Sequence, residues 1–457
     1  MTLVAALLLS ATAFDGAAAL RHASALAALG PHPWGSTRNA AAAQYVAAEM
    51  RAAGLDVELQ PFTRGGRSGA NVVGTLRGPG DDFVLVAAHH DTAPAAPGAY
   101  DDGGGVGVLL EAARVLAAEE ARPRTIVFAS FDGEEAEGGA RDEAVGSQAF
   151  VERLGPRARA LVAAFVVEMS GWKGGTPVVH PIPYADLRET GRAVVAPGWL
   201  VRRALGGARD AGSPLGVMDP YVGVLVQAAA RTFRVRLYGD DVSLLRAGRP
   251  ALFASDSSFS AFYPDYHKAS DTADKLDPAA LERMGRAVVG VARALAQAPP
   301  GPAEEPRWLA AFGAVVDGVW LLVIGGLALL PGLRAAAKAG GAAIAVRVVH
   351  VGLVGLLLWR HPVPALWVFL LPLALLPFTR RWWAVLLALL PALALAAVGA
   401  YALSRGAVRG VWLEPWELGV AAVALALGFV WPGGGGKRGS RGGGRKGGGG
   451  RRRGLPK

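Results

Sequence analysis

The sequence predicts an α/β domain with a three-layer, mostly parallel sheet, followed by an all-α transmembrane domain. Two observations lead to this prediction. Strand-like apolar runs alternate with helical stretches over residues 20–300, whereas residues 308–431 consist mainly of Leu, Ala, Val and Trp. Alternating strands and helices are typical of a parallel sheet with helices on both faces. Long apolar segments with few charges are typical of membrane-spanning helices.

The elements of the first domain follow one another in a regular order. Residues 20–60 have the pattern of a helix, a loop, a second helix and a strand. Two further strands follow, joined by a turn, with the sequences NVVGTLRG and DDFVLVAAH. The chain then alternates helix, strand, helix and strand, in the segments GGVGVLLEAARVLAAEEA, RTIVFASF, GSQAFVERLG and ALVAAFVVEM. Ligands of such sheets bind at the carboxyl ends of the strands, and acidic residues gather at these ends.

Outside residues 20–300, the amino-acid composition separates an N-terminal apolar run, a linker and a set of long apolar segments. Hydrophobic residues make up 52% of the 457 residues, which is too many for an ordinary soluble protein. Residues 1–19 hold an apolar run that suits a signal sequence or a truncated membrane anchor, with a buried helix of the first domain as the alternative. Residues 301–307 form a linker rich in Pro and Glu. About five apolar segments of near membrane-spanning length follow, near 308–331, 341–359, 363–378, 382–403 and 414–431, a second soluble helical domain being the alternative.

The net charge of +10 belongs largely to residues 432–457, a Gly- and Arg-rich tail without acidic residues. The rest of the chain is nearly neutral, so no specific nucleic-acid partner is expected. We expect the tail to be disordered and attracted to a lipid bilayer rather than to RNA. The positive-inside rule then places the tail in the cytoplasm and residues 20–300 on the extracytoplasmic side of a bacterial-type inner membrane. The chain has no cysteine, which excludes disulfides, a thiol nucleophile and Cys-ligated zinc.

The segment AHHDT ends an apolar strand with two histidines and an aspartate. In an extended chain, residues i and i+2 point to the same side, so His89 and Asp91 face together and His90 faces away. A histidine paired with a carboxylate suits a metal ligand, because the carboxylate fixes the tautomer of the ring. We therefore expect His89 to bind a metal, Asp91 to orient it, and His90 to be structural.

Four further motifs place acidic or imidazole side chains at strand-to-loop junctions. Asp101 lies in the Gly-rich turn GAYDDGGG, where a carboxylate can bridge two cations. In DGEE, Glu135 can bind a metal while Glu134 acts as a general base. Glu168 closes the apolar strand ALVAAFVVEM and needs a cationic partner. His267 follows a turn-rich stretch in YHKASDT. Each motif alone is weak, but their order along the chain is specific.

In their order, these motifs resemble those of the two-zinc aminopeptidases of metallopeptidase family twenty-eight, which includes the secreted bacterial leucyl aminopeptidases. That family's pattern runs His-x-Asp, Gly-Ala-x-Asp-(Asp/Asn)-x-x-Gly, Glu-Glu, Asp/Glu and His-Thr-x-x-Asp-Thr. The chain has HHD, GAYDDGGG, EE, VVEM and HKASDT at these places, supported by WGS, NVVGTLRG and GSQAF. The resemblance covers residues 20–300 and implies a zinc-exopeptidase, phosphorylase/hydrolase-like fold.

The resemblance also implies a site and a function. The ligands that it implies are His89, Asp101 and Glu168 for a first zinc, and Asp101, Glu135 and His267 for a second. Two Zn²⁺ per chain, bridged by Asp101, would activate a shared water and polarise a scissile carbonyl. Glu134 would be the base, and the expected pocket residues are Tyr238, Asp240 and Tyr266. The predicted function is a membrane-anchored aminopeptidase that acts on peptide or protein N-termini.

The chain departs from the family pattern at three places. Lys268 replaces the Thr of the last motif, GDD replaces Ser-Asp-His and places Asp240 at the family's Asp, and the insert AEGGARDEAV follows the Glu pair. A similar insert occurs in glutaminyl cyclases, single-zinc relatives with the same fold, so a cyclase-like acyltransferase is one alternative. A catalytically silent ectodomain, as in transferrin-receptor relatives, is another. A transport function of the apolar segments is the third, with Asp317, Arg347 and His350 as candidate residues.

Overall fold

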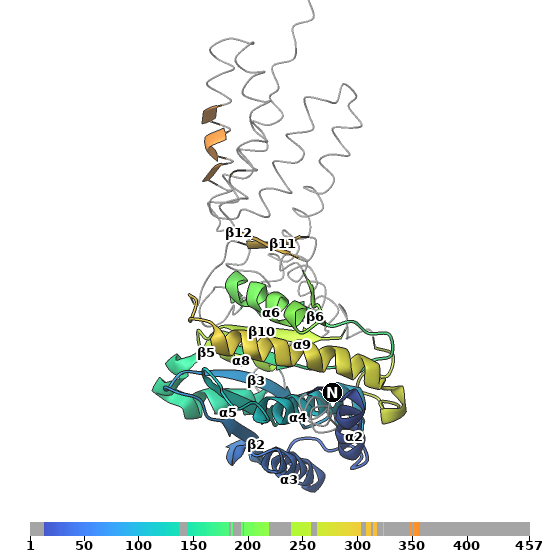
Figure 1. The fold of residues 1–457 in the computed structure, drawn as a ribbon. Coiled ribbons are helices and arrows are strands. Elements are labelled where there is room, and N and C mark those ends of the chain that lie inside the picture. Colours follow the sequence, from blue (N-terminus) through green and yellow to red (C-terminus); the bar gives the residue numbers. More distant parts are fainter. Residues whose placement is uncertain are drawn as a thin grey trace, which may run out of the picture.

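The computed structural model describes residues 13–136, 144–181, 184–185, 193–194, 196–218, 239–256, 263–302, 308–311 and 314–317, with a few positions between 323 and 356. The first part of the chain forms a layered α/β domain, in which helices pack against a central sheet (Figure 1). Residues 1–12, the basic tail and most of the apolar segments beyond residue 317 lie outside the described residues.

An eight-stranded sheet runs through the domain in the order β1-β2-β4-β3-β5-β10-β6-β9. Its strands are β1 (Asp56–Arg64), β2 (Arg67–Leu76), β3 (Phe83–His89), β4 (Thr125–Phe131), β5 (Leu161–Val167), β6 (Val178–His180), β9 (Gly216–Val217) and β10 (Ala251–Ser255). The central strands β4, β3, β5 and β10 are parallel to one another. Strand β2 pairs antiparallel with both β1 and β4, and β6 pairs antiparallel with β10. The sheet is therefore mixed, and the expected parallel arrangement holds at its centre.

Helices cover both faces of the sheet. On one face lie α2 (Gly16–Ala27), α3 (Thr37–Ala52), α4 (Gly104–Ala117), α6 (Gly198–Asp210) and α9 (Pro278–Gln297). On the other face lie α5 (Val145–Leu154) and α8 (Asp240–Arg246). Helix α9 lies between α6 and α4 (Figure 1). This arrangement confirms the three layers predicted from the alternation of strands and helices.

A separate pair of short strands consists of β7 (Tyr184–Ala185) and β8 (Ala193–Val194).

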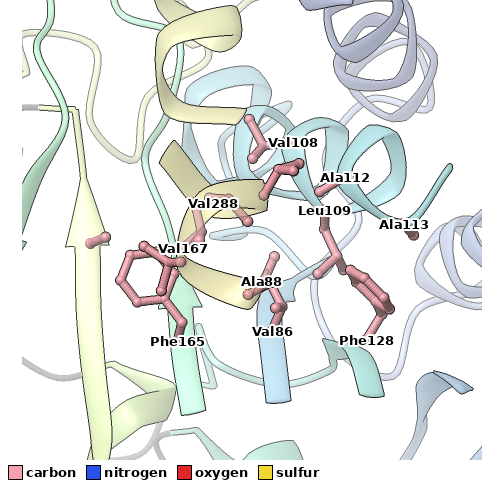
Figure 2. Packing of buried hydrophobic residues seen from close by; sticks show 14 of the residues in the cluster. Val86, Ala88, Val108, Leu109, Ala112, Ala113, Phe128, Phe165, Val167 and Val288 are labelled. Atoms are coloured by element: carbon pink, nitrogen blue, oxygen red, sulfur yellow. The ribbon is translucent and has the colours of Figure 1, made fainter. Parts of the chain in front are cut away.

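The side chains of β3 alternate between the two layers. Every residue of β3 is buried, and those directed to the α4 and α9 layer are Val84, Val86 and Ala88, whereas Phe83, Leu85 and Ala87 belong to the opposite layer. Figure 2 shows Val86 and Ala88 on the sheet facing Leu109 of α4 and Val288 of α9. Burial of one such aliphatic side chain contributes about 1.5–3 kcal/mol. The continuous apolar run in the sequence is thus explained by a strand that is covered on both faces.

Side-chain caps fix where several helices begin. The capping residues are Asp15 for α2, Ser36 for α3 and Asp277 for α9, each of which accepts a hydrogen bond from a backbone N–H of the first turn. Just before the first of these caps, Phe14 is buried against Gly285 of α9. Residues 13–19, which composition assigned to a signal or anchor segment, therefore lie within the folded domain.

The chain after α9 stays attached to the domain. Trp199 Nε1 donates a hydrogen bond to the carbonyl oxygen of Pro302 at 2.6 Å, and Trp308 is buried against Gly198. A hairpin follows, formed by β11 (Trp308–Ala311) and β12 (Ala314–Asp317). The helix predicted from residue 308 onward is therefore wrong for residues 308–317.

Few residues of the predicted membrane segments belong to the part of the chain that the structure describes. Among the helices that the structure describes, none is both long enough and apolar enough to cross a bilayer. Apart from the hairpin and a few isolated positions, the segment 308–431 lies outside the described residues.

Candidate metal centre

Three neighbouring strands bring predicted site residues to one edge of the sheet. Strand β3 ends at His89, β4 is followed by Glu134 and Glu135, and β5 is followed by Glu168. Because β4, β3 and β5 are adjacent and parallel, their carboxyl ends meet at the same edge. The strand order thus brings three expected ligands and the expected base, Glu134, to one edge of the sheet.

Asp101, from the turn before α4, lies between two histidines. Its Oδ1 is 3.4 Å from His89 Nε2, and its Oδ2 is 3.3 Å from His267 Nε2. His267 Nε2 is also 2.7 Å from Glu135 Oε1. His267 adopts a positive φ of 57°, an uncommon conformation for a residue other than glycine. Each carboxylate oxygen of Asp101 faces a different imidazole, which suits a carboxylate that bridges two cations.

The donor atoms of this centre fit a metal ion. Ligand atoms of Asp101, Glu135 and His267 all lie within 4.8 Å of one another. His89 Nε2, Asp101 Oδ2 and Glu168 Oε1 are buried, and none is oriented for a hydrogen bond. Buried polar atoms without partners are costly, and a cation would satisfy them. Imidazole and carboxylate donors suit zinc. His89 and Glu168 lie outside the 4.8 Å group, so the structure gathers the second expected ligand set more closely than the first.

Burial dominates the electrostatics of the centre. It raises the pKa of the Glu134 and Glu168 carboxyls well above the usual value, and neighbouring carboxylates raise both further. Burial also raises the pKa of Glu135 to about 7. For His267, burial lowers the pKa, but the facing carboxylates of Asp101 and Glu135 outweigh it and raise the pKa to about 10. A proton on His267 thus supplies positive charge among these carboxylates in the metal-free protein.

Asp91 is fully buried and holds two parts of the centre together. Its carboxylate oxygens accept hydrogen bonds from Glu134 N and Glu135 N, each at 3.0 Å. His89 Nδ1 lies 3.1 Å from the carbonyl oxygen of Asp91 and 3.5 Å from its Oδ1. Asp91 therefore fixes the turn that carries the two glutamates, in addition to facing His89. This second contact is not evident from the sequence.

His90 points away from the centre into a separate polar cluster. Its Nδ1 lies 3.0 Å from Ser130 Oγ, and its Nε2 lies 3.9 Å from Asp132 Oδ2. Burial lowers the pKa of His90 to about 4, so the ring is neutral at pH 7. Asp132 in turn accepts a hydrogen bond from Asn39 Nδ2 at 3.0 Å, which ties α3 to the end of β4.

Three further buried aspartates hold the loops that carry the potential ligands, and sequence reasoning missed all three. Each joins separate segments by accepting hydrogen bonds from their N–H groups or hydroxyls. The donors are the backbone N–H groups of His89, Gly105 and Met169 for Asp102, those of Tyr100 and Asp101 for Asp271, and those of Gly171 and Trp172 with the Tyr100 hydroxyl for Asp256. Asp102 and Asp271 stand inside the motifs GAYDDGGG and HKASDT, which was the available signal.

The expected pocket residues have different surroundings. Tyr266 stacks on His267 with ring centroids 3.7 Å apart. Burial and the surrounding carboxylates raise the pKa of Tyr266 well above its usual value, so its hydroxyl stays protonated. Asp240 is the first residue of α8 and is fully buried. Tyr238 lies outside the described residues.

Known proteins resemble this domain in both sequence and fold. Residues 71–292 match peptidase family M28, and this segment contains every expected metal ligand. A probable leucine aminopeptidase from Arthroderma otae is 26% identical over 232 residues, which cover 48% of this chain and 56% of that protein. Aminopeptidase YwaD from Bacillus subtilis is 37% identical over 84 residues, which cover 17% of each protein.

A solved structure supports the fold assignment. LapA from Legionella pneumophila aligns with a TM-score of 0.51 at 18% identity, over 65% of this chain and 78% of that one. The described α/β domain thus shares the fold of this protein. The chain spans about half the length of the first curated relative it matches, 56% for the Arthroderma otae protein.

Proposed function

We propose that the protein is a zinc-dependent aminopeptidase that hydrolyses the N-terminal peptide bond of peptides or proteins. The observation that carries the proposal is the position of Asp101, whose two carboxylate oxygens face His89 and His267 beside the turn with Glu134 and Glu135. The match of residues 71–292 to peptidase family M28 and the aminopeptidase names of the relatives support it.

The proposal assigns a task to each side chain of the centre. The zinc ligands are His89, Asp101, Glu135, Glu168 and His267, for two ions per chain. Bound zinc would polarise the scissile carbonyl and lower the pKa of the attacking water. Glu134 accepts a proton from the water and transfers it to the leaving amine. The protonated hydroxyl of Tyr266 is available to donate a hydrogen bond to the substrate.

A glutaminyl cyclase-like acyltransferase is the second candidate function, and one observation favours it. In the described part of the chain, the ligand atoms that gather within 4.8 Å belong to one set, Asp101, Glu135 and His267. Three protein ligands are what a single catalytic zinc requires. Such an enzyme would close an N-terminal glutamine into a ring and release ammonia.

The test measures hydrolysis of leucyl, alanyl and lysyl p-nitroanilides by the full chain, before and after a chelator and after zinc is restored. We expect activity that the chelator removes and zinc restores. Glu134→Gln is expected to lower kcat by roughly 10²–10⁴-fold with bound zinc unchanged. Glu120→Gln, an exposed glutamate after α4, is the matched control and should keep full activity.

The same protein is assayed on peptides with N-terminal glutamine. Cyclisation without nitroanilide hydrolysis would decide for the acyltransferase. A folded, zinc-loaded protein that performs neither reaction would contradict both candidates.

A further inference from the structure

The segment between β4 and α5 carries the two glutamates of the metal centre, and its two ends meet. Val145 N donates a hydrogen bond to the carbonyl oxygen of Gly133 at 3.0 Å. One residue further out on each side, a Cβ added to Gly146 would lie only 2.1 Å from the carbonyl oxygen of Asp132. The segment therefore departs from β4 and returns to α5 through a narrow neck, which these four residues form.

Asn71 of β2 spans this neck with a single side chain. Its Oδ1 accepts a hydrogen bond from Asp132 N at 3.1 Å, and its Nδ2 donates one to the carbonyl oxygen of Gly146 at 2.8 Å. Asn71 is 1% exposed, so both bonds are shielded from water. A carboxamide has an acceptor and a donor on one carbon, which is what bridging an N–H group and a carbonyl group requires. Asn71 therefore ties the outgoing end of the segment to the returning end.

The turn with the two glutamates is held from both strands that flank β4, which are β3 and β2. On the β3 side, Asp91 accepts hydrogen bonds from the backbone N–H groups of both glutamates, each at 3.0 Å. On the β2 side, Asn71 holds Asp132 N, and Asp132 Oδ2 also accepts a hydrogen bond from Ala70 N at 2.9 Å. Asp91 thus fixes the turn itself, whereas Asn71 fixes the ends from which the turn projects.

We propose that Asn71 is a positioning residue for Glu134, the base of the proposed aminopeptidase reaction, on which this inference rests. Asn71 acts through the backbone of Asp132, two residues before Glu134. A general base must lie within hydrogen-bond distance of the proton that it accepts, and a displacement of about 1 Å can lower the rate by roughly a hundredfold. Closure of the neck keeps the Glu134 carboxylate in place for this transfer. The alternative is that Asn71 contributes to stability alone.

The first test compares the kinetics of Asn71→Ala and Ser213→Ala in the zinc-saturated full chain. Ser213 is also buried, and its Oγ donates a hydrogen bond to the carbonyl oxygen of Arg283 in α9 at 2.7 Å, so Ser213→Ala removes a buried hydrogen bond outside the neck. At a temperature where both variants are folded, Asn71→Ala is expected to lower kcat for leucyl p-nitroanilide by roughly tenfold to a hundredfold with KM unchanged. Ser213→Ala should keep the wild-type kcat. If Asn71→Ala does not fold, Asn71→Ser, which keeps a hydroxyl for one of the two bonds, replaces it.

A double-mutant cycle separates positioning of the base from general support of the pocket. Asn71→Ala is combined with Glu134→Gln, which removes the base. A residue that acts through Glu134 has no further effect once Glu134 is replaced, so the double variant should have about the same kcat as Glu134→Gln alone. If the two losses multiply instead, Asn71 does not act through Glu134.

Amide hydrogen exchange tests the neck independently of activity. Exchange in peptides that cover residues 132–146 is measured by mass spectrometry of the full chain. In Asn71→Ala these amides should exchange roughly tenfold faster than in the wild type, because the neck opens more often without its side-chain bridge. In Ser213→Ala they should exchange at the wild-type rate.

Three results would overturn the proposal. They are a folded Asn71→Ala with the wild-type kcat, losses that multiply in the cycle, and unchanged exchange over residues 132–146. A wild-type chain that does not hydrolyse nitroanilides would contradict the aminopeptidase function, and the exchange measurement would still decide whether Asn71 holds the turn.

Discussion

Asp256 illustrates how a residue outside the expected ligand set supports the centre. Its Oδ2 accepts hydrogen bonds from Gly171 N at 2.6 Å and Trp172 N at 2.5 Å, and its Oδ1 accepts one from the Tyr100 hydroxyl at 2.8 Å. Tyr100 directly precedes Asp101. The carboxyl group of Asp256 thus links the segment after β5 to the turn that presents the bridging carboxylate.

Replacement of Asp256 by Ala is expected to destabilise the protein, because it leaves buried donors unpaired. Each such donor costs about 1–3 kcal/mol in the free energy of unfolding. Asp256→Asn keeps one carbonyl oxygen for the two N–H groups and a polar group for the Tyr100 hydroxyl, so it should recover most of the loss. Urea unfolding of both variants measures the difference. Equal stabilities for Asp256→Ala and the wild type would contradict the structural role.

Zinc binding is expected to release protons and to strengthen as the pH rises. In the metal-free protein, burial disfavours the charged form of His267, but Asp101 and Glu135 outweigh it and raise its pKa to about 10. An imidazole nitrogen must lose its proton before it binds a metal. At pH 7 zinc therefore displaces that proton, and its apparent affinity falls as the pH is lowered. Calorimetry in two buffers of different ionisation enthalpy measures the release, and identical heats in both buffers would contradict it.

The elements around the centre could be predicted where the sequence signal was strong. The apolar runs that became β3, β4 and β5 end at the residues expected, because a strand buried on both faces must be apolar throughout. The prediction of a helix at 308–317 was wrong, because these residues form the hairpin of β11 and β12. The antiparallel pairing of β6 with β10 was missed because β6 has only three residues.

The stability of the fold is expected to be sensitive to a larger side chain at Gly104, where α4 closely approaches the segment after β5. A Cβ on Gly104, at the start of α4, would lie 1.9 Å from the carbonyl oxygen of Ser170, which follows β5. Gly104→Ala should therefore cost about 1–3 kcal/mol or more in the free energy of unfolding, because backbone has to move. Gly206→Ala is the control within α6, where nothing lies within 4 Å of the added Cβ, and it should stabilise by about 0.5–1 kcal/mol. Thermal unfolding compares the two, and equal shifts in the midpoint would refute the close contact.

At the scale of the whole molecule, the ordered motifs predicted more than the composition did. Residues 71–292 match peptidase family M28, the family that the five short motifs resemble. Composition gave less reliable boundaries, since Phe14 at one end and Trp308 at the other are both buried in the domain. Which buried aspartates hold the loops could not be predicted, because their hydrogen bonds join residues distant in sequence. The extracytoplasmic location of the domain stays a prediction.

The central claim is that Asp101 joins two metal positions into one centre, and the zinc content of the purified full chain tests it most directly. Zinc per chain is measured by mass spectrometry of the wild type and of Asp101→Asn after dialysis. We predict two zinc ions in the wild type and the loss of both in the variant, because each position needs an oxygen of Asp101. A wild type without zinc, or a variant that keeps its zinc, would contradict the account.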